Sequence, residues 1–147
     1  EGTKLSYVAC GVVTSDGDLD LALRLKQLHD RLTEVIRTWT PDEVSVEETF
    51  VNKDAQATLK LGQARAMSLL VPALHGLPVA EYSATLIKKA VVGAGHADKS
   101  QIAFMVKRLL PTCGEVKADA ADALAVAITH AQLRKRSLIE AMHRGAA

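Results

Sequence analysis

Hydrophobic and polar residues along the chain form alternating helical and extended patterns. Between residues 20 and 40, apolar side chains recur every three or four positions from Leu21 to Trp39, which is the spacing of an amphipathic helix. Residues 43–47, EVSVE, instead place Val44 and Val46 on one face and leave Glu47 at the end of a short strand. The full pattern predicts strands at residues 4–14, 43–47 and 78–82, and helices at residues 20–40, 55–74, 84–92, 98–110 and from about 118 onward.

Several residues predict where these elements begin and end. Ser83 and Asp98 are N-cap residues, and Gln101 lies three positions after Asp98, which is the spacing of a capping box. Pro41 is expected to end the first helix. Pro72 is expected to kink the helix at 55–74 or to stop it early.

Alternating strands and helices indicate an α/β domain with a mixed or parallel sheet and helices on both faces. The 147 residues suit a single domain over residues 1–147 with a buried core. No apolar run reaches the length of a membrane span, and no leader pattern opens the chain. The two cysteines, Cys10 and Cys113, have no metal-type spacing. We therefore expect a cytoplasmic protein.

Charge is distributed unevenly along the sequence. The net charge is +1, but residues 1–83 hold 8 basic and 12 acidic residues, whereas residues 84–147 hold 10 basic and 5 acidic residues. A basic half can bind a polyanion and an acidic half can bind cations. Both halves can also be ordinary solvated surfaces.

Three carboxylates are the best candidates for chemistry. Glu47 ends a predicted strand, and Asp119 and Asp122 are three residues apart in a helix that is otherwise almost entirely apolar. Crowded carboxylates favour a bound cation, and oxygen ligands suit Mg²⁺ or Mn²⁺. Such a site is typical of metal-assisted phosphodiester hydrolysis. The alternative is that acids in a first helical turn are stabilised by the helix dipole alone.

Other residues could contact a nucleic acid. Phe50 follows Glu47 in a polar loop and could stack on an unpaired base, or it could anchor the loop in the core. Lys88 and Lys99 belong to a set of basic residues that could bind phosphates or simply face solvent. In the helix at 55–74, Leu61, Ala64 and Ser68 share one side, which suits either core packing or self-association.

Four segments together resemble the RuvC family of bacterial Holliday-junction resolvases. They are VEETF at 46–50, NKDAQATLKLGQAR at 52–65, IKKAVVGAGHADKSQ at 87–101 and ADAADALAVAITH at 118–130. The segments occur in the family's order with natural spacing over most of the chain. The resemblance implies an RNase H-like fold with a mixed β-sheet flanked by helices.

The same resemblance implies roles for six residues of this sequence. Glu47, Asp119 and Asp122 would be catalytic metal ligands for one or two Mg²⁺ ions per active site, with Mn²⁺ as a substitute. Phe50 would be the junction-stacking aromatic, and Lys88 and Lys99 would be the two functionally important lysines.

For the whole protein, the resemblance implies a homodimeric endonuclease of homologous recombination and DNA repair. It would cut four-way DNA junctions by paired symmetric nicks and work with the RuvA and RuvB branch-migration proteins. Two alternatives are a junction-binding form that does not cut and another RNase H-like nuclease with a different substrate.

The sequence also departs from the family pattern. Family members open with a strand that carries a catalytic Asp, whereas this sequence begins at Glu1 and offers no replacement. We therefore expect a chain that lacks its first strand, about 20 residues at the N-terminus, and that as it stands is poorly folded, catalytically inactive or both. Ala66, where the family usually has Gly, and Pro72 are smaller departures in the helix that the family uses for dimerisation.

Overall fold

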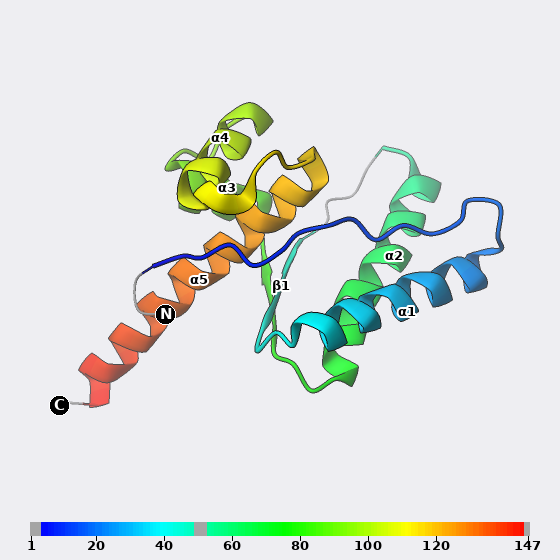
Figure 1. The fold of residues 1–147 in the computed structure, drawn as a ribbon, viewed down its shortest axis with the longest axis horizontal. Coiled ribbons are helices and arrows are strands. Elements are labelled where there is room, and N and C mark those ends of the chain that lie inside the picture. The colour runs from blue at the N-terminus through cyan, green and yellow to red at the C-terminus, as the bar shows by residue number, and fades with distance from the viewer. Residues whose placement is uncertain (1–3, 49–52, 146–147) are drawn as a thin grey trace. The chain divides into compact units, whose positions relative to one another are not determined.

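A computed structural model describes residues 4–48 and 53–145, with side chains up to residue 134 at the C-terminal end. Helices and short strands alternate as far as β2, and the elements after it are all helical (Figure 1), in the order that the sequence pattern predicts. The elements are α1 (Leu21–Trp39), β1 (Val44–Glu47), α2 (Ala55–Leu74), β2 (Val79–Tyr82), α3 (Ala84–Val92), α4 (Lys99–Leu109), the short 3₁₀ helix η1 (Pro111–Cys113) and α5 (Ala118–Gly145).

The chain forms two compact units, which are described separately. The α1–α2 unit comprises Val12–Glu81, and the α3–α5 unit comprises Glu1–Gly11 together with Tyr82–Ala147.

In the α1–α2 unit, β1 pairs with β2 and α2 connects them. The Val44 amide donates to the Pro78 carbonyl at 2.9 Å, which joins the beginnings of the two strands. The strands therefore run in the same direction, as a helical crossover between neighbouring strands requires. This arrangement leaves Glu47 at the C-terminal end of β1.

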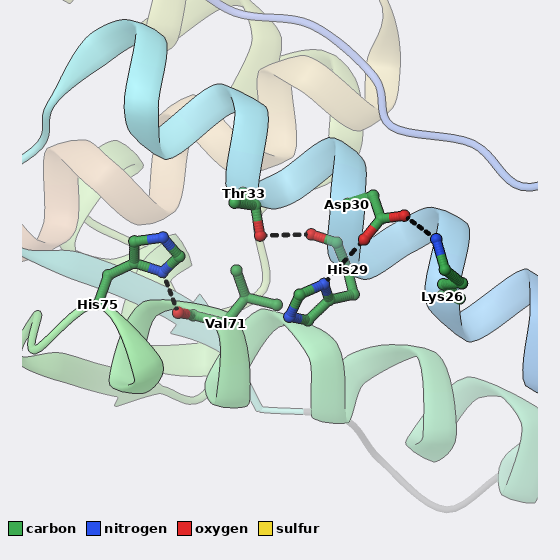
Figure 2. Close-up of polar contacts among 6 residues, drawn as sticks. All are labelled: Lys26, His29, Asp30, Thr33, Val71 and His75. Atoms are coloured by element: carbon green, nitrogen blue, oxygen red, sulfur yellow. Dashed lines mark hydrogen bonds and ion pairs between the residues drawn. The ribbon is translucent and has the colours of Figure 1, made fainter.

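Helix α1 packs against α2 within the same unit. Figure 2 shows the polar groups near this contact: the Lys26 ammonium lies 2.6 Å from the Asp30 carboxylate, and the Thr33 hydroxyl donates to the His29 carbonyl at 2.8 Å. On α2, His75 Nδ1 donates to the Val71 carbonyl at 2.9 Å. His75 thereby satisfies a carbonyl that the helix end leaves without an intrahelical partner.

Pro72 does not stop α2, which continues to Leu74, and a kink at Pro72 stays a prediction. Proline removes one amide donor and crowds the preceding turn, but residues after it can still adopt helical angles. The His75 contact and the hydrogen bond from the Gly76 amide to the Ala73 carbonyl complete the last turn.

In the α3–α5 unit, α3, α4 and α5 pack against one another around one apolar cluster. Small residues on the buried side of α5, Ala121 and Ala125, allow neighbouring helices to approach closely. The fully buried Thr129 donates its hydroxyl hydrogen to the Ala125 carbonyl at 2.8 Å. The cluster consists of Ile87, Val91, Ala97, Ile102, Val106, Leu110, Ala125, Val126 and Ile128.

The strand expected at residues 4–14 is absent, because residues 4–16 have no regular secondary structure. Burial nevertheless alternates from Lys4 to Cys10, and Leu5 and Tyr7 pack against the apolar cluster. The alternation of side chains is therefore as the sequence predicts. A strand also requires backbone pairing, and the one sheet in the described part of the chain contains only β1 and β2.

The predicted helix starts are confirmed. Ser83 accepts the Leu86 amide, and Asp98 forms a complete capping box with Gln101. In the described residues, no helix is both long and apolar enough to cross a membrane.

Candidate active site

Asp119 and Asp122 lie in the first two turns of α5, where the helix emerges from the apolar cluster. Asp119 is exposed and the Asp122 side chain is 39% exposed, whereas the intervening Ala120 and Ala121 are buried. The amides at a helix N-terminus carry a partial positive charge, so acidic residues are common in the first turns of helices. The two acids therefore share a solvent-accessible face, as their spacing predicts.

Lys99 is the first residue of α4, and the structure places it beside Asp122. Its Nζ lies 3.8 Å from Asp122 Oδ2, and the Lys99 side chain is 82% exposed. A long, exposed ion pair of this kind contributes little to stability. The contact therefore leaves the Asp122 carboxylate available to a ligand and the Lys99 ammonium available to an anion.

The capping box at Asp98 fixes the point from which Lys99 projects. Asp98 Oδ1 accepts the Gln101 amide at 2.9 Å and the Ser100 hydroxyl at 2.6 Å, while Gln101 Oε1 accepts the Asp98 amide. The Ser100 hydroxyl and the Gln101 amide hold the pKa of Asp98 below its usual value. An ionised Asp98 thus stabilises the turn that carries Lys99.

Glu47 belongs to the α1–α2 unit, where it is exposed at the end of β1. Arg65 of α2 donates from Nε to the Glu47 carbonyl at 3.2 Å, and its guanidinium also pairs with the Glu81 carboxylate of β2. Arg65 therefore ties the ends of both strands to α2 and limits the motion of the backbone that carries Glu47.

Arg65 is a residue to which the sequence pattern assigns no role of its own. It does lie in the LGQAR segment, and it is the one charged residue between Leu61 and Leu74. An arginine in an otherwise uncharged helical stretch is the signal that could have identified it.

The remaining candidates have different settings. Lys88 is half-buried on α3, in the same unit as Asp119, Asp122 and Lys99. Phe50 lies outside the described residues. His130 of α5 shares a 2.7 Å hydrogen bond between its Nδ1 and the Tyr82 hydroxyl, so it has a structural partner.

The chemistry of Asp119 and Asp122 fits a hard divalent cation. Carboxylate oxygens are the ligands that Mg²⁺ prefers, and Mg²⁺ usually takes only one or two of them together with water and substrate phosphate. Within the described part of the α3–α5 unit, no third acid, histidine or cysteine joins the pair. The sequence predicts Glu47 as a further ligand.

Comparison with known proteins gives consistent matches over most of the chain. The family model described as crossover junction endodeoxyribonuclease RuvC matches residues 1–130. The protein of that name from Methylorubrum extorquens strain PA1 is 68% identical over 146 residues, which are 99% of this chain and 77% of the relative. The Rhizobium johnstonii protein is 59% identical over 133 residues, which are 90% of this chain and 79% of that relative.

Two solved structures share the fold. Thermus thermophilus RuvC is similar with a TM-score of 0.81 at 31% identity, and its complex with a Holliday junction substrate gives 0.84 at 30% identity. Each match covers 93% of this chain and 84% of the solved chain. The predicted RNase H-like α/β class is therefore confirmed.

Proposed function

The chain belongs to the RuvC family of crossover junction endodeoxyribonucleases, and on that premise we propose that Glu47, Asp119 and Asp122 are its catalytic metal ligands. Its activity is the cleavage of Holliday junctions in recombination and repair. The family match carries this assignment, and the accessible acid pair on α5 supports the choice of site.

The acids would bind Mg²⁺, with Mn²⁺ as a substitute, as one or two ions per active site. Enzymes of this family are metal-dependent nucleases. A bound divalent cation would activate water and stabilise the leaving oxygen of the phosphodiester. The protein's own part is to position the carboxylates: the start of α5 presents Asp119 and Asp122 on one accessible face, and Arg65 ties the end of β1 that carries Glu47 to α2.

Lys99 and Lys88 would contact the DNA backbone. The position of Lys99 supports this role, because its ammonium lies close to Asp122 and remains largely exposed. A phosphate bound by Lys99 would therefore be near a catalytic carboxylate. Phe50 would stack on an unpaired base next to the cut.

We also propose that one nuclease domain over residues 1–147 acts as a homodimer in the cytoplasm. A twofold dimer presents two equivalent sites to a junction of approximate twofold symmetry, which accounts for paired symmetric nicks. The exposed Leu61 and the small residues Ala64 and Ser68 on one side of α2 support a self-association face. RuvA and RuvB would be partners on the same DNA.

The direct test is nicking of a synthetic four-way junction by the full-length protein. We expect Mg²⁺-dependent paired nicks in strands of like polarity, little cleavage of linear duplex of the same sequence, and none in EDTA. Binding without any cleavage would instead support a junction-binding module. Preferential cleavage of an RNA–DNA hybrid would support a different RNase H-like nuclease.

A further inference from the structure

The solvent face of α4 carries an unusually exposed aromatic residue. Phe104 is 65% exposed, although aromatic residues make up only 3% of the chain. The buried side of the same helix is formed by Ile102 and Val106 of the core cluster, which Leu110 joins just after the helix ends. Phe104 points away from that core, so packing inside this unit does not explain it.

Phe104 lines two neighbouring hollows in the α3–α5 unit. One, of about 450 Å³, is lined by Val92, Ser100, Gln101, Phe104 and Met105. The other, of about 190 Å³, lies towards η1 and the start of α5 and includes Lys107 and Ala121 in its lining. The ring is therefore a ridge with space on both sides, a shape that can pack against a flat ligand group.

The charges on α4 favour a polyanion as the occupant. The helix segment KSQIAFMVKRL contains Lys99, Lys107 and Arg108 and no acidic residue. Lys107 and Arg108 lie one turn after Phe104 and are exposed. Glu115, from the loop before α5, pairs with the Lys107 ammonium at 2.5 Å, and both side chains are exposed, so Lys107 exchanges this partner for a phosphate when DNA binds.

The same helix begins beside the candidate active site. Lys99, at the start of α4, lies 3.8 Å from Asp122. At 1.5 Å per residue, Arg108 is about 13 Å further along the helix axis than Lys99. One DNA strand advances ~3.4 Å per nucleotide, so α4 spans about four nucleotides.

We propose that the solvent face of α4, defined here as Phe104, Lys107 and Arg108, is an additional DNA contact that grips a strand leading away from the cut. Phe104 packs its ring on the apolar face of a nucleotide, and Lys107 and Arg108 bind the flanking phosphates. The proposal rests on the junction-cleaving function, because that function supplies the polyanion.

The test is binding of a fluorescent four-way junction in EDTA, where no cleavage occurs, over a series of salt concentrations. We expect Phe104→Ala to weaken binding roughly tenfold without changing the salt dependence, because stacking and apolar contacts release no counterions. Replacing both Lys107 and Arg108 with Gln should lower the slope of log K against log salt by ~0.9 for each lost phosphate contact.

Leu59→Ala is the matched control, since Leu59 is 62% exposed on α2 and lies on the side of that helix opposite Leu61. It should bind as the wild type does, and an unchanged thermal transition should show that Phe104→Ala is folded. Wild-type affinity for Phe104→Ala would overturn the proposal, as would an equal loss for Leu59→Ala. Failure of the wild-type protein to bind the junction would instead refute the proposed function.

Discussion

Lys99 Nζ lies 3.8 Å from Asp122 Oδ2, although the two residues are far apart in the sequence. The contact joins the first residue of α4 to the start of α5 and brings a cation next to a candidate metal ligand. Because both side chains are substantially exposed, the pair is poorly suited to stabilising the fold. Its position favours a role in binding substrate.

Replacing Lys99 with Gln should therefore weaken DNA cleavage and binding and leave the stability of the fold unchanged. We expect cleavage to fall roughly tenfold or more, because a cation beside the reacting phosphate is lost. The slope of log K against log salt for junction binding should fall by ~0.9, the value for one lost phosphate contact. Lys26→Gln is the matched control, since Lys26 is also an exposed lysine paired with an aspartate. If both variants behave alike, Lys99 has no specific role.

Arg65 provides a test of how Glu47 is positioned. Arg65→Lys keeps the charge but cannot reproduce the two contacts to the Glu47 carbonyl and the Glu81 carboxylate. We expect cleavage to fall about 10- to 100-fold, as for groups that orient metal ligands, with a higher Mg²⁺ requirement and unchanged junction affinity. Arg37→Lys on α1 should have no such effect. If the Arg65→Lys protein has a normal Mg²⁺ dependence, Arg65 stabilises the fold but does not position Glu47.

The capping box predicts a pH effect on stability. The pKa of Asp98 is lower in the folded protein than in the unfolded chain, so its contribution is present above pH ~4 and is lost as the pH falls through the lowered folded value. Asp98→Asn should keep the cap at neutral pH, since Asn is an equally good N-cap residue. Asp98→Ala should lower the melting temperature by several degrees.

Thermal melts of these variants between pH 3 and pH 7 check this expectation. The wild type should lose stability towards acid more steeply than Asp98→Asn does. Parallel pH profiles for the two proteins would show that Asp98 does not contribute in this way.

Local sequence signals predicted most of the elements and the acid pair. The spacing of apolar residues located the helices to within about one residue of their observed bounds, and Asp98 with Gln101 specified the start of α4. Asp119 and Asp122 could be assigned to one face because a helix fixes the relation between positions three apart.

Contacts between distant segments could not be predicted in the same way. Residues 4–10 alternate as a strand does, but strand formation depends on a pairing partner that the segment's own sequence does not encode. The approach of Lys99 to Asp122 and the tether from Arg65 to the Glu47 carbonyl likewise depend on packing between elements.

Phe50 allows a test of the stacking role that the sequence suggests. Phe50→Ala should slow junction cleavage about 5- to 150-fold, because the loss of base stacking costs on the order of 1–3 kcal/mol. Phe50→Trp should retain activity because it keeps an aromatic face. Both rates are measured on the same junction, with circular dichroism as the control for folding. An unfolded Phe50→Ala protein would favour the alternative that Phe50 anchors its loop in the core.

The most direct test of the proposed metal site is Asp122→Asn in the full-length protein, measured for both Mg²⁺-dependent nicking and junction binding. Removing a group that only orients a metal ligand typically lowers activity roughly 10- to 100-fold. Removing a ligand itself should lower it more, so we expect cleavage to be abolished. Junction affinity should be retained, because phosphate contacts supply it. Glu115→Gln, which also removes an exposed acid that pairs with a lysine, should still cleave. Normal cleavage by Asp122→Asn, or loss of binding together with cleavage, would contradict the assignment.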